Sequence, residues 1–472
     1  MMPRTNVISS LPMKPARRIP ITRRLLLVSL ALPLALPAFA REDVRRDFQK
    51  TAPLPAGRSL KIDNSLGNVT VRAQAKNEVT VIGAIHCSAN TAAEAKRWCD
   101  QIQIRFDESG SGITVRTEYP NHHNTNNLGW SVNLDIAMPE NAPLEVRNRF
   151  GGVTVQGTHA GAWINNRNGN IYVANARGKQ RIENEFGNVE VQSGDGDLNL
   201  TNGNGWVRAT DITGIAEIAN RFGDVRVTNV AKSLAVRAAN SKVDVEHTGG
   251  PATITTSFGD VRVWDVKSDL AVHNQNGRVE AKTVTGTADL RTSFAAVKFS
   301  GIGKGVTVTA QNAQVTGDTV GESAVVQTSF AGVDVRGVKG GAHVTAGNAT
   351  VRLVDIGGDA YVKTSFGGVT IDNAGGPVTV ENNNGTVAAS PKAGQACKPI
   401  GLRTSFAPIQ VTLPAGVGYN VSSKTSFGRI HSQYEMTVSG QIGNDELNGR
   451  IGGGGCDLRL TNQNGNIDIL KR

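Results

Sequence analysis

An eighteen-residue repeat runs through most of this chain and restricts the folds that it can adopt. Every eighteenth residue from Phe150 to Asn384 is alternately Phe or Asn, without a miss or an insertion, and the residue that follows is always Gly, Ala or Ser. We call these fourteen positions the markers: Phe150, Asn168, Phe186, Asn204, Phe222, Asn240, Phe258, Asn276, Phe294, Asn312, Phe330, Asn348, Phe366 and Asn384. Because Phe and Asn alternate, the full repeat is a 36-residue pair of turns.

Apolar residues lie two apart on both sides of each marker. Around Asn168, for example, they are Ile164 before the marker, and Ile171 and Val173 after it. Side chains alternate between the faces of a strand, so each unit predicts two or three short strands. One unit cannot bury its apolar face alone, but stacked units share a continuous core. The repeat therefore predicts an all-β fold, a single-stack β-solenoid with 18-residue turns, and the crossover rule favours right-handed winding.

The residue six places before each marker predicts where the markers point. It is small before several Phe markers, as at Ala216 and Ala252, and larger before several Asn markers, as at Leu198 and Leu234. Close-packed interiors require such volume compensation, so we expect the Phe markers to lie in the core. The Asn markers should then bond to each other's backbone at the corner, because a buried amide must be satisfied.

The two ends of the array differ from its middle. Residues 41–140 lack the strict register and predict an N-terminal cap with one short helix, since Thr91 and Glu94 form a capping box. The regular solenoid is expected over 141–390. Residues 391–472, with a four-residue insertion before Phe406, predict C-terminal turns and a cap. Caps cover strand edges that would otherwise invite aggregation.

The first forty residues have the pattern of an export signal. Arg23 and Arg24 precede a short apolar stretch and Ala38-Phe39-Ala40, which predicts cleavage before Arg41. No later apolar run is long enough to span a membrane. We expect an exported protein without a mature transmembrane segment, located in a periplasm, on the cell surface or in the medium.

The four cysteines predict disulfides, because export leads to an oxidising compartment. Four cysteines allow three pairings, and we favour the local one, Cys87 with Cys99 and Cys397 with Cys456. A zinc site is the alternative, but the sequence contains no CxxC pair. We expect no metal and no cofactor; His122 and His123, in an Asn-rich stretch, predict an exposed polar loop.

The charge balance argues against nucleic acid as a partner. Lys and Arg number 50 and Asp and Glu 40, a net charge of +10, but residues 1–40 hold six basic and no acidic residues, which leaves 44 against 40, or +4. A nucleic-acid binder needs a clustered basic face.

Two units of the chain carry a resemblance to a known family. They are Asn-Arg-Asn-Gly-Asn-Ile-Tyr-Val at 166–173 and Asn-Gln-Asn-Gly-Asn-Ile-Asp-Ile at 462–469. These units, behind an export signal, resemble the bacterial "putative adhesin" family of β-strand-repeat proteins of the cell envelope. The resemblance implies the solenoid architecture and an envelope partner, and it brings no catalytic residues.

Two outward columns near the markers carry the candidate binding residues. Their signs alternate over several neighbouring turns, and opposite charges about 5 Å apart attract by roughly 0.2–1 kcal/mol a pair. The column pattern therefore predicts a solvated ion ladder. The candidates for an exposed binding surface are Trp206, Arg226, Lys242, Arg262 and Arg278.

The same columns offer one catalytic hypothesis. Asp224 and Asp260 are two turns apart, about 9.6 Å, at the upper edge of the carboxylate separation in inverting glycosidases. Trp206 would supply a stacking face for a sugar ring. Lys242 lies between the two aspartates in the column and should hold both ionised, which opposes a general-acid role.

Three functions remain open from the sequence. We favour a non-enzymatic envelope protein that presents an extended β-surface for adhesion or for binding a polysaccharide or protein partner. The alternatives are a polysaccharide-cleaving β-helix enzyme and a structural envelope protein that self-associates.

Overall fold

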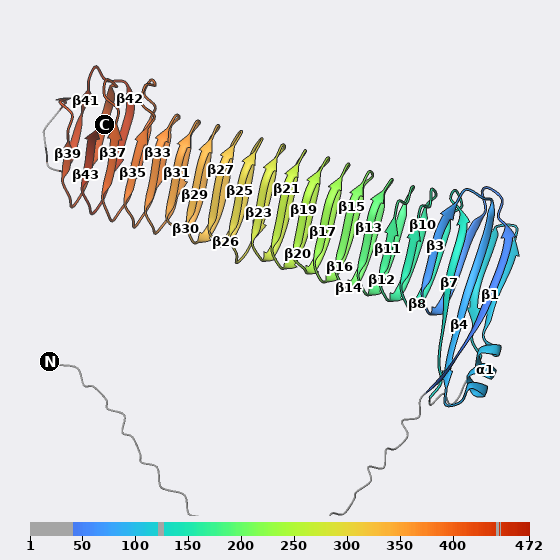
Figure 1. The fold of residues 1–472 in the computed structure, drawn as a ribbon. Coiled ribbons are helices and arrows are strands. Elements are labelled where there is room, and N and C mark those ends of the chain that lie inside the picture. Colours follow the sequence, from blue (N-terminus) through green and yellow to red (C-terminus); the bar gives the residue numbers. More distant parts are fainter. Residues whose placement is uncertain (1–40, 121–126, 440–442, 444) are drawn as a thin grey trace, which may run out of the picture. The chain divides into compact units, whose positions relative to one another are not determined.

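The computed structural model describes residues 41–120, 127–439, 443 and 445–472. The predicted export signal and the predicted loop at His122 and His123 lie outside these residues. Residues 42–472 form one compact unit, a two-sheet β-solenoid in which the strands stack along the unit (Figure 1).

Each turn of the solenoid contributes one strand to each sheet. The first sheet contains β1 (Glu42–Pro53), β3 (Val69–Gln74), β4 (Glu78–Ala89), β7 (Gly129–Pro139), β9 (Val153–Gln156), β11 (Ile171–Ala174), β13 (Val189–Gly194), β15 (Val207–Ile212), β17 (Val225–Val230), β19 (Val243–Thr248), β21 (Val261–Val266), β23 (Val279–Val284), β25 (Val297–Ile302), β27 (Val315–Val320), β29 (Val333–Val338), β31 (Val351–Ile356), β33 (Val369–Ala374), β35 (Val387–Pro391), β37 (Ile409–Leu413), β39 (Ile430–Ser432) and β43 (Ile467–Lys471).

The second sheet contains β2 (Ser59–Leu66), β5 (Gln103–Ser109), β6 (Gly112–Glu118), β8 (Leu144–Phe150), β10 (Ala162–Asn168), β12 (Gln180–Phe186), β14 (Leu198–Asn204), β16 (Ala216–Phe222), β18 (Leu234–Asn240), β20 (Ala252–Phe258), β22 (Leu270–Asn276), β24 (Ala288–Thr292), β26 (Val306–Asn312), β28 (Ala324–Phe330), β30 (Ala342–Asn348), β32 (Ala360–Lys363), β34 (Val378–Glu381), β36 (Ile400–Arg403), β38 (Tyr419–Lys424), β40 (Met436–Val438), β41 (Glu446–Ile451) and β42 (Cys456–Thr461).

The eighteen-residue register predicted from the sequence is confirmed between neighbouring turns. Ile164 pairs with Ile182 in the second sheet, and Ile171 pairs with Val189 in the first, both in parallel. Identical positions therefore lie above one another, and their apolar side chains form one core between the sheets. From β8 to β35 this pattern gives fourteen turns without interruption.

The core is filled by pairing large with small residues on neighbouring turns. Leu234 pairs with Ala252, and both are buried. Phe299, which is fully buried, pairs with Gly317 in the next turn. Volume compensation thus takes place within one column, from turn to turn.

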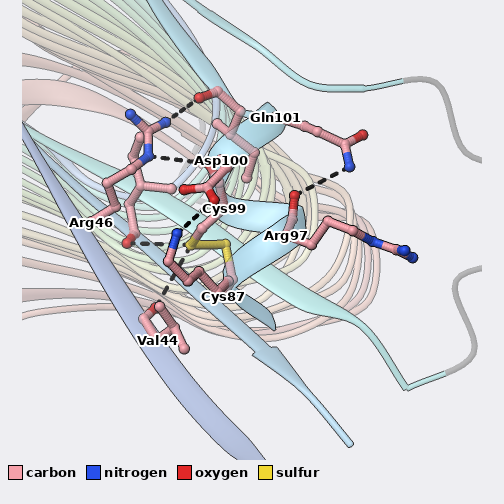
Figure 2. Close-up of a disulfide and its surroundings, with 10 residues drawn as sticks. Val44, Arg46, Cys87, Arg97, Cys99, Asp100 and Gln101 are labelled. Carbon is pink, nitrogen blue, oxygen red and sulfur yellow. Dashed lines mark hydrogen bonds and ion pairs between the residues drawn. A yellow bond between two sulfur atoms is a disulfide. The ribbon is translucent and has the colours of Figure 1, made fainter. Parts of the chain in front are cut away.

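The N-terminal end is closed by antiparallel strands and a helix. β1 pairs with β4, β4 with β7, and β5 with β6, all antiparallel. The predicted helix is confirmed as α1 (Ala92–Gln101), where Thr91 caps the first turn by accepting the Glu94 N–H at 3.2 Å. The disulfide Cys87–Cys99 joins β4 to α1, and Arg46 on β1 donates to the Cys99 carbonyl at 3.2 Å (Figure 2).

The C-terminal end departs from chain order. β42 lies between β36 and β38, and β43 lies between β37 and β39. The last strands of the chain therefore form a turn that is inserted beneath an earlier segment. The disulfide Cys397–Cys456, with a Cα–Cα distance of 5.7 Å, fastens the start of β42 to the loop that precedes β36. Both disulfides have the pairing that the sequence favoured.

Candidate functional site

The Phe markers lie on the surface, so the prediction that they fill the core is wrong. Nine of the chain's 13 phenylalanines form one row along the stack, and each of them is between 43% and 77% exposed. We call this row the Phe edge: Phe150, Phe186, Phe222, Phe258, Phe294, Phe330, Phe366, Phe406 and Phe427. Phe is among the residue types most often buried, so a row of exposed rings is unusual for a soluble surface.

The corner of each turn explains this outward direction. Ile164 and Asn166 are buried before the corner, and Ile171 and Val173 are buried after it, so the inward positions change from even to odd numbers. Strict alternation along the strand would place marker Asn168 inside. The space inside the corner is already occupied by the residue two places before the marker.

That position is buried in each turn and holds Asn in the first turns, then Thr or Asn with Ala at 238, 310 and 346. Asn166 Nδ2 donates to the Gly169 carbonyl at 3.0 Å and to Asn184 Oδ1 at 3.3 Å, and Asn184 Nδ2 donates to Asn202 Oδ1 at 3.2 Å. Later turns place Thr here, where Thr328 Oγ1 donates to the Phe330 carbonyl at 3.1 Å. The buried amide ladder is thus formed by residues two positions before the markers, and the prediction that the Asn markers form it is wrong.

The Asn markers are exposed or half-buried and alternate with the Phe rings along the same edge. Asn168 pairs with Phe186, and Phe186 pairs with Asn204. Neighbouring strands are about 4.8 Å apart, so successive Phe positions are about 9.6 Å apart. The Phe edge is thus a ladder in which aromatic rings and amides alternate.

This alternation continues through the inserted C-terminal turn. Phe406 forms a bridge with Asn464, and the Phe427 N–H donates to the Gln463 carbonyl at 2.7 Å. Asn464 therefore lies between Phe406 and Phe427 in space, although it follows both in the chain. Phe and Asn therefore continue to alternate along the edge, although the strands at this end are not stacked in chain order.

A hollow of about 600 Å³ lies beside the Phe edge, on the outer side of the second sheet. Its lining includes Phe186, Gly203, Ala219, Arg221 and Arg237. The small residues leave space between the longer side chains. At Gly203 a Cβ would lie 2.5 Å from the Glu185 carbonyl oxygen, so only glycine permits this approach of two turns.

A second hollow, of about 300 Å³, lies on the other side of the corner and contains three of the predicted binding residues. Trp206, which is 37% exposed, lines it together with Arg226 and Lys242. Lys242 Nζ lies 2.8 Å from an oxygen of the buried Asp244 carboxylate, and Arg226 lies 3.9 Å from the same oxygen. The other Asp244 oxygen is buried without a hydrogen-bond partner among the described residues.

The other two predicted residues lie outside this hollow. Arg262 is half-buried. Arg278 is exposed on a later turn, where its backbone N–H donates to Asp260 Oδ1 at 3.0 Å. The cross-turn ion pairs of the predicted ladder include Glu190–Arg208 at 3.5 Å. Shorter pairs form within a strand, such as Lys282–Glu280 at 2.7 Å, and the Lys282 hydrogen bond holds the pKa of Glu280 below its ordinary value.

A third hollow, of about 410 Å³, follows the corner after the first-sheet strands. Its residues Asp211, Asn229, His247 and Asp265 occupy one column with φ between 57° and 58°, a left-handed conformation that the sequence pattern did not reveal. They bond to one another, with Asn229 Nδ2 donating to Asp211 Oδ1 at 2.7 Å and His247 Nδ1 lying 2.9 Å from Asp265 Oδ2. The polar groups of these side chains thus form hydrogen bonds with one another within the column.

Residues 58–283 match the Toastrack family, described as Toastrack DUF4097. The matched segment includes the Asn-Gly unit at 166–173, one of the two units on which the adhesin-like β-repeat resemblance rests. The Toastrack segment covers just under half of the chain and ends within β23, while the same register continues to β35.

A solved structure, described as a "putative cell adhesion protein" from Clostridium sporogenes, is also similar to this chain. The identity is 9%, the TM-score is 0.15, and the match covers 90% of this chain and 100% of the other. No curated protein matches the chain.

The solenoid presents polar columns on its outer faces, an arrangement that suits a binding surface. The two candidate carboxylates do not share a hollow. Asp224 lines the second hollow, whereas Asp260 accepts a hydrogen bond from the backbone N–H of Arg278. In the described part of the chain, no group of three or more His, Cys, Asp or Glu side chains could hold a metal ion. The same residues contain no helix with the length and hydropathy of a membrane span.

Proposed function

We propose that this protein is an exported, non-enzymatic component of the cell envelope that binds an extended polysaccharide along the Phe edge. The observation that carries the proposal is the row of nine exposed phenylalanines, arranged at every second turn. A scaffold role would not require these rings to face solvent, because the corner is already filled by the buried Asn and Thr ladder.

The chemistry of the edge suits a linear glycan. Aromatic rings offer flat apolar faces on which the apolar face of a sugar ring can stack. Their spacing of about 9.6 Å is close to the length of two hexose units in an extended chain. The Asn markers between the rings supply amide donors and acceptors for sugar hydroxyls. Many weak contacts in a row give affinity through their number.

Two further observations support an envelope location. The disulfides Cys87–Cys99 and Cys397–Cys456 fit an oxidising compartment outside the cytoplasm. They lie at the two ends of the stack, where unpaired strand edges would otherwise be exposed. The family match adds an adhesin-like β-repeat architecture.

The proposal is tested by co-sedimentation of the purified protein with insoluble envelope and plant polysaccharides. The variant Phe258→Ala/Phe294→Ala/Phe330→Ala should lose most of its binding. The matched control removes exposed apolar side chains away from the edge, Ile82→Ala/Ile215→Ala, and should bind as the parent does. Binding that both variants retain would overturn the role of the Phe edge.

The alternatives are distinguished in the same tubes. Shortened polysaccharide chains that disappear in Asp224→Asn/Asp260→Asn would establish the enzyme hypothesis. Concentration-dependent polymers in sedimentation velocity would establish self-association. If no polysaccharide binds, our glycan proposal is wrong.

A further inference from the structure

The hollow around Gly203 has a chemistry that a neutral glycan would not use. Two of its lining residues, Arg221 and Arg237, form no ion pair within 4.0 Å among the described residues. Both arginines are exposed, on neighbouring turns of the second sheet. The one carboxylate in the lining, Glu185, is paired with Arg167 at 3.1 Å.

The neighbouring side chains leave these arginines accessible. In the column next to the markers, Arg221 stands between Gly203 and Ala239, which have little or no side chain. Ala219 occupies the same column as Arg237, one turn before it. The ring of Phe186 forms one wall of the hollow. The hollow therefore combines an aromatic face, two unpaired guanidinium groups and a floor of small residues.

We infer that this hollow binds a carboxylate-bearing sugar of an acidic polysaccharide, whose chain continues along the Phe edge. The apolar face of the sugar ring stacks on Phe186. The carboxylate accepts hydrogen bonds from Arg221 and Arg237, because a guanidinium matches the geometry of a carboxylate and stays charged. Asn204 and Thr201, also in the lining, face the ring hydroxyls.

Charge complementarity selects this ligand class over a neutral glycan. The pairing of Glu185 with Arg167 leaves an excess of positive charge in the hollow. A hydrogen bond to a charged group contributes roughly 1.5–3 kcal/mol, or about 10- to 140-fold in affinity. This inference rests on the proposed glycan function and specifies its substrate class.

The test uses polygalacturonate and its methyl-esterified form, which differ in charge and share a backbone. The full protein should bind polygalacturonate at least about tenfold more tightly than the ester. The variant Arg221→Gln/Arg237→Gln should remove this preference. The control Arg97→Gln/Arg352→Gln, with the same change in net charge at exposed sites elsewhere, should keep it.

Each result bears on the inference. Equal binding of acid and ester by the parent protein would overturn the carboxylate site while leaving glycan binding along the Phe edge intact. Absence of binding to both, and to the neutral polysaccharides, would overturn both proposals. Polyglutamate that binds as tightly as polygalacturonate through the same two arginines would show a general polyanion site and overturn the sugar assignment. Unchanged thermal unfolding of the glutamine variants verifies that the comparison concerns binding.

Discussion

The ring of Phe299 occupies the space that a side chain at Gly317 would need. A Cβ at Gly317 would lie 1.9 Å from Phe299 Cζ, and the two residues pair on neighbouring turns. Phe299 is fully buried, whereas Phe258 on the Phe edge is 53% exposed. The same residue type therefore has two different roles within one repeat array.

The first prediction follows from this difference. Phe299→Ala should lower the free energy of unfolding by about 3–5 kcal/mol, because it opens a cavity in the core. Phe258→Ala should change it by less than about 0.5 kcal/mol. Urea unfolding followed by circular dichroism measures both. A large loss at Phe258 would contradict the exposed position of the Phe edge.

The second prediction concerns the buried ladder at the corner. Asn184→Ala should cost about 1–3 kcal/mol, because the Asn166 amide and the Gly187 carbonyl lose their partner. Asn184→Thr should cost less, since other turns place Thr in this column and bond its hydroxyl to a backbone carbonyl. Equal losses for the two variants would argue that packing alone sets the corner.

The third prediction concerns the N-terminal cap. Deletion of residues 41–140 removes β2 and β3, which pair with β8 and β9, together with the antiparallel strands and α1. The exposed edges of β8 and β9 should then cause aggregation. Size-exclusion chromatography with light scattering measures the outcome. A soluble, monomeric truncated protein would show that this region is not a cap.

The fourth prediction concerns the inserted C-terminal turn. Cys397→Ser/Cys456→Ser should lower stability by about 2–4 kcal/mol, because the disulfide restricts a 59-residue separation in the unfolded chain. Proteolysis should begin at β42 and β43 in the variant and not in the parent. The pair Cys87→Ser/Cys99→Ser, at a separation of 12 residues, serves as the comparison and should leave the C-terminal turn resistant.

The fifth prediction concerns acid. Hydrogen bonds from Arg291, Arg336 and Lys282 hold the pKa values of Asp289, Asp334 and Glu280 below their ordinary values of 3.8, 3.8 and 4.5. A carboxyl whose pKa is lower in the folded than in the unfolded state stabilises the fold above its ordinary pKa, and that contribution is lost as the pH falls through the folded value.

The urea midpoint should therefore be level near neutral pH and fall below about pH 4. In Asp289→Asn/Asp334→Asn/Glu280→Gln the midpoint should already be lower at pH 7, and its decline in acid should be shallower. A parallel decline in parent and variant would assign the acid sensitivity to other groups.

Much of the fold could be predicted because the information repeats. Apolar residues two apart, such as Ile171 and Val173, recur with the same spacing in each turn, and only a stack buries all of them. The helix at 92–101 could be predicted from local capping chemistry at Thr91. The preferred cysteine pairing followed from separation along the chain.

The candidate site could not be predicted in the same way. The size alternation at Leu198 and Ala216 is real, but it compensates volume within its own column and says nothing about the markers. The outward direction of Phe186 depends on the Asn184 side chain, which fills the corner by bonding to Gly187 and Asn202. The αL column at Asp211 and His247 had no sequence signal beyond its period.

The sequence by itself determined the strands, their register and the stacking of identical positions, because a strict period leaves one arrangement that buries every apolar column. Only the tertiary structure decided which side of the corner each marker faces, since that depends on the residue that fills the inside of the corner between stacked turns. It also decided the place of Asn464 between Phe406 and Phe427. Such an insertion joins segments that are distant in the chain, and no local pattern specifies the edge at which a returning strand will pair.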